Sequence, residues 1–175
     1  MADKATGRNY KRFACQMLSI VFLVGVDHII KFFAERDLKP TVSYELIPGF
    51  LGLHYAQNTG AAFSFMSGMT AQLSVITGGA LLGMVFYLFF TKNNNRFYHI
   101  LFPLVISGGV GNLIDRVTRG YVVDYFEFLF LRFAIFNFAD ILVTCSAAVL
   151  IAYLIYDAVR EYRKERTQKQ QHEPA

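Results

Sequence analysis

Four long apolar stretches, separated by shorter polar or mixed segments, dominate the pattern of the chain. They run over Phe13–Ala34, Ala71–Phe90, Tyr98–Asp115 and Asn137–Asp157. Each is long enough to cross a bilayer as a helix, which takes about 17–25 mostly apolar residues. The first stretch follows basic residues, as a signal peptide does, but it is too long for the apolar region of one and no small-residue cleavage site follows it. The pattern therefore predicts four membrane-spanning helices.

Two of the connecting segments carry patterns of their own. Val42–Ile47 and Phe50–Tyr55 flank Pro48-Gly49, a turn pair, and predict a small antiparallel hairpin. Tyr125–Phe138 is almost entirely aromatic and aliphatic, yet too short and too interrupted to span, so we expect an interfacial element there. The charged, Gln-rich residues 161–175 predict a solvated tail after a single membrane-embedded domain over residues 1–160.

The distribution of Lys and Arg predicts the orientation. The N-terminal tail, the 91–97 loop and the C-terminal segment from Arg160 onward together hold eleven of them, whereas the 35–70 and 116–136 segments hold five. Cytoplasmic loops carry the excess of positive charge in membrane proteins. We therefore expect both termini and the 91–97 loop in the cytoplasm, and the other two segments on the external side.

Composition supports a membrane protein and weakens other classes. The 175 residues are 54% hydrophobic with a mean hydropathy of +0.36, which exceeds that of ordinary soluble domains. The net charge of +4 follows the membrane topology, so nucleic-acid binding is not expected. Cys15 and Cys145 lie in apolar stretches without CxxC spacing, and the four histidines form no HExxH motif. A zinc protease therefore has little support, and we expect no metal or cofactor.

The polar side chains within the predicted helices gather at one depth, near the external surface. They are Asp27, Lys31, Asn112, Asp115, Arg116, Asn137 and Asp140. The inner halves of the helices carry almost nothing polar. Ionisable groups inside a membrane are candidates for function, and their convergence at one level strengthens that interpretation.

Two acids stand apart from the others. Asp27 with Lys31, and Asp115 with Arg116, are more simply explained as ion pairs that fix helix packing than as functional groups. Asp124 and Asp140 have no basic residue three or four positions away, although each lies among apolar residues at the predicted outer boundary. Two carboxyl groups held close together can share a single proton, as in aspartic hydrolases.

The remaining polar and small residues leave alternatives open. Asn58, Asn112 and Asn137 can satisfy backbone groups at helix ends or hold substrate carbonyls. The Gly79-xxx-Gly83 and Ser107-xxx-Gly111 spacings predict close contacts between helices.

Four motifs in a fixed order carry a resemblance to a known family. They are Asn58-Thr-Gly-Ala-Ala-Phe-Ser64, Gly111-Asn-Leu-Ile-Asp-Arg116, Gly120-Tyr-Val-Val-Asp124 and Phe136-Asn-Phe-Ala-Asp140. Together with Asp27-xxx-Lys31 and the four-helix pattern, this set closely resembles the bacterial lipoprotein signal peptidases (type II signal peptidases) over about Val21 to Thr144.

The resemblance implies a fold and an activity. The fold is an all-α integral membrane protein with four transmembrane helices, a small external β-hairpin or sheet, and a short external interfacial helix at Tyr125–Phe133. The activity is that of an inner-membrane aspartic endopeptidase, which cleaves prolipoproteins before a diacylglyceryl-modified cysteine. The expected partners are these substrates and membrane lipids, and the expected protein is a monomer without metal or cofactor.

The resemblance also assigns residues. Asp124 and Asp140 match the catalytic acids, and the supporting or substrate-binding positions match Asp27, Lys31, Asn58, Asn112, Asp115, Arg116 and Asn137. Two positions depart from the familiar pattern: His28 stands where an amide is more common, and Tyr125 where Phe is common. We expect these two residues to tune the substrate groove.

Two other functions compete with hydrolysis. A small proton-coupled carrier also uses buried Asp and Lys, but it needs polar groups at mid-depth. A structural membrane subunit would use the acids only to hold helices together. Loss of activity in Asp→Asn variants that still fold would separate an enzyme from both.

Overall fold

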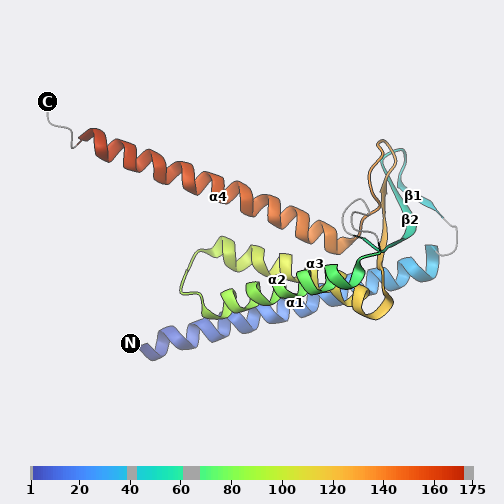
Figure 1. Ribbon diagram of the computed structural model, residues 1–175, viewed down its shortest axis with the longest axis horizontal. Helices are drawn as coiled ribbons and strands as arrows, with labels where there is room; N and C mark the ends of the chain where they lie inside the picture. The colour runs from blue at the N-terminus through green and yellow to red at the C-terminus, as the bar shows by residue number, and fades with distance from the viewer. Residues whose placement is uncertain (1, 39–42, 61–67, 172–175) are drawn as a thin grey trace.

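The computed structural model describes residues 2–38, 43–60 and 68–171. Its helices are α1 (Ala2–Leu38), α2 (Thr70–Phe90), α3 (Arg96–Arg119) and α4 (Phe138–Gln171), and its strands are β1 (Tyr44–Ile47), β2 (Leu51–Asn58) and β3 (Val122–Phe128). The helices run lengthwise, and the small sheet stands at one end of them (Figure 1). The start of α1 and the end of α4 lie at the opposite end (Figure 1).

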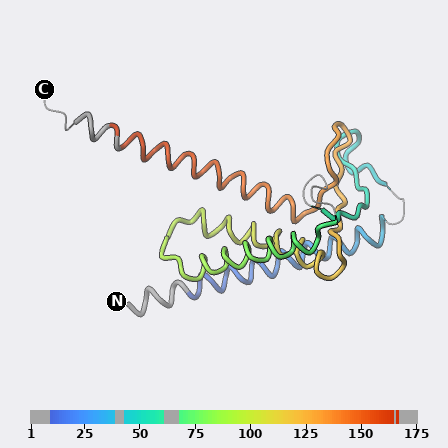
Figure 2. The backbone as a smooth tube through the Cα atoms, in the orientation of Figure 1, coloured from blue at the N-terminus to red at the C-terminus, as the bar shows by residue number. Residues whose placement is uncertain are grey.

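The four predicted spans are confirmed as helices. Tyr10–Leu38, Thr70–Phe90, Arg96–Arg119 and Phe138–Lys164 are each long and apolar enough to cross a membrane. Many of their largest apolar side chains are exposed, Val75 at 76% for example, as expected of helices with lipid as their solvent. The C-terminal half of α4 runs apart from the other three helices (Figure 2) and continues past Arg160 as a helical extension.

α3 is the central helix, and glycines bring each of its neighbours close. A Cβ on Gly108 would come within 2.3 Å of the Ala139 carbonyl oxygen of α4. One on Gly109 would come within 2.6 Å of Leu81 of α2, and one on Gly111 within 2.5 Å of the Asp27 carboxylate of α1. The contacts predicted around Ser107-xxx-Gly111 are confirmed, and they involve three different helices.

The prediction of a close contact at Gly79-xxx-Gly83 is wrong. A Cβ at either position would meet nothing within 4 Å in the described part of the chain. α2 packs against the protein through the face that carries Leu81 and Leu88. Both glycines lie on other faces of the helix, outside the interior. The spacing alone does not reveal which face of an apolar helix meets protein.

A second polar cluster lies at the end of the bundle remote from the sheet. The buried Gln16 of α1 donates through Nε2 to the His99 carbonyl oxygen at 2.9 Å, and His99 Nε2 lies 2.6 Å from the Asn93 carbonyl oxygen. Here the prediction that the inner halves carry almost nothing polar is wrong. Gln16 and His99 lie 83 residues apart in the chain, so only the tertiary structure reveals their contact.

The sheet has the order β1-β2-β3, and both pairs of strands are antiparallel. β1 and β2 confirm the predicted hairpin, although its first residue, Val42, lies outside the described residues. Gly49 in the turn has φ +65°, which glycine adopts without steric cost, and its N–H donates to Glu45.

β3 corrects the expectation of a short interfacial helix at Tyr125–Phe133. Residues 122–128 pair with β2, and Val123 and Tyr125 pack against Ala34 and Leu38 at the end of α1. The segment Val-Val-Asp-Tyr-Phe-Glu-Phe is rich in β-branched and aromatic residues, which suit a half-buried strand. Val122, Val123 and Tyr125 are buried, while pairing with β2 satisfies the backbone of the strand.

We predict that Gly108→Ala destabilises the protein, because its methyl group would overlap the α4 backbone rather than a movable side chain. Overpacking of this kind costs about 1–3 kcal/mol, which thermal unfolding in detergent will measure. Gly79→Ala is the matched control in an open helical position, and there it should be neutral or stabilising. Equal unfolding temperatures for the two variants would contradict the close α3–α4 contact.

Candidate active site

The N-terminus of α4 is closed by a reciprocal pair of hydrogen bonds. The Asp140 N–H donates to Asn137 Oδ1 at 2.9 Å, and the Asn137 N–H donates to Asp140 Oδ2 at 3.1 Å. This is a capping box, in which the residue before a helix and the third residue within it satisfy each other's free N–H groups. The motif Asn137-Phe-Ala-Asp140 therefore fixes the position of the Asp140 carboxylate locally.

The N–H groups of the first two residues of α4 donate to acceptors elsewhere in the chain. The Phe138 N–H donates to the Tyr125 hydroxyl oxygen at 3.1 Å, and the Ala139 N–H donates to Asp27 Oδ1 at 3.1 Å. The first N–H groups of any helix lack partners within the helix itself. Here they attach α4 to β3 and α1.

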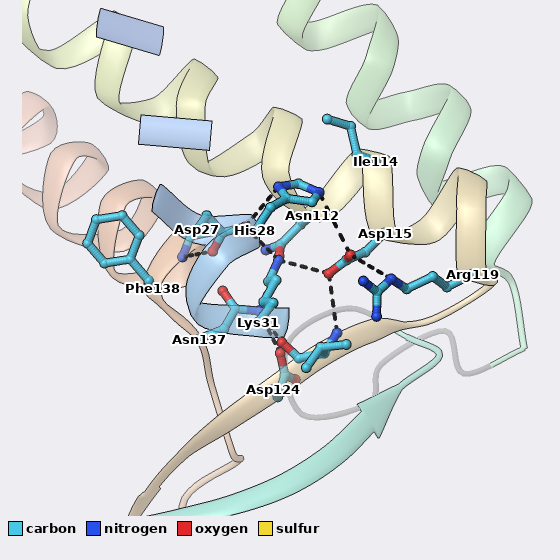
Figure 3. A network of polar contacts seen from close by, with 12 residues as sticks. Asp27, His28, Lys31, Asn112, Ile114, Asp115, Arg119, Asp124, Asn137 and Phe138 are labelled. Atoms are coloured by element: carbon cyan, nitrogen blue, oxygen red, sulfur yellow. Dashed lines mark hydrogen bonds and ion pairs between the residues drawn. The ribbon is translucent and has the colours of Figure 1, made fainter. Parts of the chain in front are cut away.

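Asn137 joins the two acids that the sequence singled out. Its Nδ2 donates to Asp124 Oδ1 at 2.6 Å, while its backbone N–H bonds Asp140. Asp124 extends from β3 and is only 2% exposed, whereas Asp140 in the first turn of α4 is half-buried. Figure 3 shows Asp124 and Asn137 beside the charged cluster on α1 and α3.

Each acid also accepts one further amide. Asn58 Nδ2 on β2 donates to Asp124 Oδ2 at 3.0 Å, and Asn112 Nδ2 on α3 donates to Asp140 Oδ1 at 2.8 Å. Burial, and secondarily the charge of Asp140, raise the pKa of Asp124 to about 7, against the opposing effects of the amide hydrogen bonds and of Lys31. The arrangement suits two carboxyl groups that hold one proton between them.

Lys31 connects this amide layer to two further carboxylates. Its ammonium lies 2.8 Å from Asp27 Oδ2 and 2.9 Å from Asp115 Oδ2, and it donates to Asn112 Oδ1 at 2.9 Å. All three charged side chains are buried. Asn112 Oδ1 also accepts from Asn137 Nδ2 at 3.1 Å, so one oxygen connects the ammonium to both amides that hold the acids (Figure 3).

The expected pairing of Asp115 with Arg116 is wrong. Asp115 pairs with Lys31 and with Arg119, whose Nε lies 3.4 Å from its Oδ1, and Arg119 also pairs with Glu35. Arg116 instead donates to the Gly60 carbonyl oxygen at 2.9 Å. Residues adjacent in a helix point about 100° apart, and this separates Arg116 from the carboxylate beside it. Residues 61–64 of the Asn58 motif lie outside the described residues.

The structure thus brings together all nine predicted site residues, and it adds Tyr125 and Glu35. Tyr125 is 1% exposed, so it lies beneath the site and does not line a groove as expected. The apolar position of its ring in β3 is visible in the sequence, but its hydroxyl contact with α4 is not. Glu35 lies one turn after Lys31 on α1, a spacing that could have indicated a shared face.

Within the described ranges, no group of three or more His, Cys, Asp or Glu side chains is arranged to hold a metal ion. Asp27 and Asp115 share the ammonium of Lys31 rather than a vacant centre. The site is therefore an assembly of carboxylates, amides and cationic side chains.

Known proteins resemble this chain over most of its length. Residues 19–156 match the family model described as Signal peptidase (SPase) II. The lipoprotein signal peptidase of Streptococcus pneumoniae (strain ATCC BAA-255 / R6) is 33% identical over 85% of this chain and 97% of its own length. That of Clostridium tetani (strain Massachusetts / E88) is 37% identical, with the same coverage.

A solved structure gives the same result. A bacterial membrane enzyme determined by the in meso method at 2.3 Å resolution is 32% identical, with a TM-score of 0.77 over 83% of this chain and 90% of that one. Extent of match, sequence identity and fold therefore agree: this chain belongs to the signal peptidase II family.

Proposed function

We propose that Asp124 and Asp140 are the catalytic pair with which this membrane aspartic peptidase removes the signal peptide from prolipoproteins. Family membership supports the activity. The observation that supports the residues is the bridge through Asn137, which holds a buried carboxyl group and a half-buried one at the N-terminus of α4. Four amide hydrogen bonds orient their oxygens.

The proposed mechanism follows from one shared proton. The ionised member of the pair takes a proton from a bound water molecule, whose oxygen attacks the scissile carbonyl carbon. The protonated member donates a hydrogen bond to the carbonyl oxygen and stabilises the oxyanion of the tetrahedral intermediate. The proton taken from water passes to the departing amine as the C–N bond breaks. The pair titrates as a unit, so neither role is assigned to one aspartate.

The other site residues divide into two groups. Lys31, Asn112, Asn137, Asp27 and Asp115 form the buried support that fixes the two acids. Asn58 donates to Asp124 and Arg116 donates to the Gly60 carbonyl oxygen, and we assign these two residues to substrate binding. Arg116 is also within electrostatic range of both acids.

We place the sheet and the two acids at the external face of a bacterial inner membrane, with both termini in the cytoplasm. The distribution of Lys and Arg supports this orientation, and the start of α1 and the end of α4 both lie at the end of the molecule opposite the sheet (Figure 1). In this position the site reaches water while its substrate remains anchored in lipid. We propose that a monomer suffices, since one chain supplies the whole cluster.

Cleavage rather than transport is the function that the site favours. The buried acids and amides form one continuous network at the end of the bundle that carries the sheet. The second polar cluster, around Gln16, is neutral apart from the histidine and lies at the other end. A carrier would need its polar groups between these two levels.

We predict that Asp124→Asn and Asp140→Asn each abolish cleavage of a diacylglyceryl-modified prolipoprotein peptide by the purified protein. The amide is similar in size but cannot take up the proton, and loss of such a group costs at least about 10²–10⁴ in rate. Glu45→Gln, on the exposed strand β1, is the matched control and should leave the rate unchanged. Near wild-type cleavage by either active-site variant, with normal insertion, would rule out the pair.

The same assay tests the lipid requirement. The unmodified peptide should be cleaved far more slowly, because each buried CH₂ contributes about 0.8 kcal/mol to holding a lipidated residue at the depth of the site. Measurement of kcat/KM for the two peptides in the same micelles decides this. Equal values would indicate a membrane-surface aspartic protease without lipid specificity.

We predict that cleavage falls as pH rises through about 7, the pKa to which burial and Asp140 raise Asp124. The sign follows from the proton count: below this pH the pair keeps its shared proton, and above it both carboxyl groups ionise and no acid remains. A pH profile of kcat between pH 5 and 9 measures it. A rate that rises steadily to pH 9 would contradict a shared proton.

We predict that cysteine labels placed near Lys92 and Arg166 react from the cytoplasmic side, and labels near Tyr44 and Arg132 from the external side. The physical basis is the excess of positive charge retained in the cytoplasm. Labelling in intact cells with a membrane-impermeant reagent measures it. External reaction at position 166 would mean an odd number of spans and would overturn the orientation.

A further inference from the structure

His28 lies against the two buried carboxylates of the support network, at a position that the proposed mechanism does not use. Its Nδ1 is 3.9 Å from Asp27 Oδ2, and its Nε2 is 4.0 Å from Asp115 Oδ1. Figure 3 shows the imidazole ring above both acids, with dashed contacts to each. The side chain is 29% exposed, yet its Nε2 atom is buried.

The hydrogen bond on the other side of the ring fixes the position of one proton. His28 Nδ1 lies 3.0 Å from the Val24 carbonyl oxygen, which can only accept, so Nδ1 carries the hydrogen. The ring is therefore oriented with Nε2 directed at Asp115. In the described part of the chain, neither His28 Nε2 nor Asp115 Oδ1 has a hydrogen-bond partner. A bare nitrogen facing that oxygen would put two acceptors against each other, whereas an N–H there would match it.

The charges around the ring favour the N–H. On α1 it faces Asp27, with Lys31 and Glu35 further along the same helix, and on α3 it faces Asp115 with Arg119. These five groups carry one more negative charge than positive. α2 contributes no charged side chain. Asp124 and Asp140 are connected to this cluster through the side-chain amides of Asn137 and Asn112. The groups that face the ring therefore carry a net negative charge, and a hydrogen-bond donor at the position of Nε2 matches them.

We propose that His28 is a positioning residue for the cleavage reaction: its ring, 3.9 Å from Asp27 and 4.0 Å from Asp115, holds both carboxylates in the places from which they orient Lys31. Lys31 in turn binds Asn112 Oδ1, and Asn112 orients Asp140. A shift of Asp115 is thereby passed to a reacting carboxyl group through one ion pair and two hydrogen bonds. The proposal rests on the assignment of Asp124 and Asp140 as the catalytic pair.

Three substitutions of His28 distinguish the role of Nδ1 from the role of Nε2. In His28→Gln the amide nitrogen reaches the place of Nε2 and presents an N–H donor toward Asp115. His28→Asn places its amide near Nδ1 and keeps only the bond to Val24, and His28→Leu keeps neither. We expect kcat close to wild type for His28→Gln and about tenfold to a hundredfold lower for the other two, with KM unchanged.

The comparison of His28→Gln with His28→Leu gives a readout that packing alone would not change. The two side chains are similar in size, but only the amide can donate a hydrogen bond. A loss of kcat in His28→Leu that His28→Gln restores therefore follows the donor and not the filled space. Unfolding temperatures in detergent identify any variant that fails to fold, in which case His28→Asn replaces His28→Leu.

The outcomes are distinct. Equal kcat for His28→Asn and wild type, or a His28→Gln as impaired as His28→Leu, would each overturn the proposal. Asp124→Asn is measured alongside. If that variant still cleaves, the catalytic pair is wrong whatever the histidine variants do. If it is inactive and the histidine variants match wild type, only the role of His28 fails.

Discussion

The buried ammonium of Lys31 is the constraint on which the rest of the site depends. An ammonium has three N–H donors, and removing it from water is unfavourable unless each meets an acceptor. Asp27, Asp115 and Asn112 supply those acceptors within 2.8–2.9 Å, and they come from α1 and α3. Breaking a buried pair of this kind costs about 3–5 kcal/mol. The register of the two helices is therefore set by one side chain.

The layout of the chain was largely predictable because its signals are local. Apolar runs of spanning length mark the four helices, and Pro48-Gly49 marks the hairpin. The proximity of Asp124 to Asp140 in space was also predictable, because both acids lie beside one chain reversal and neither has a basic residue three or four positions away. The start of α4 carries a capping box that could have been read from Asn137-Phe-Ala-Asp140 alone.

The errors concern contacts that depend on which face a residue presents. The resemblance implied a helix at Tyr125–Phe133, where the structure has the second half of β3. The apolar residues there suit either element until β2 supplies a pairing edge. Arg116 was paired with its sequence neighbour, although the helix turns it away toward Gly60. Gly79 has the spacing of a helix contact but lies on the face of α2 that the protein leaves to lipid. Sequence spacing gives periodicity, and only packing selects the face.

The way α4 begins has a consequence for the order in which the protein is completed during synthesis. Two of its first N–H groups bond Asp27 and Tyr125, which belong to segments made earlier. These two N–H groups therefore gain their partners only when α4 packs against α1 and β3. Asp124 and Asp140 are brought together in that same step. A chain that ends before α4 lacks Asp140, so the proposed catalytic pair can form only after this helix has been made.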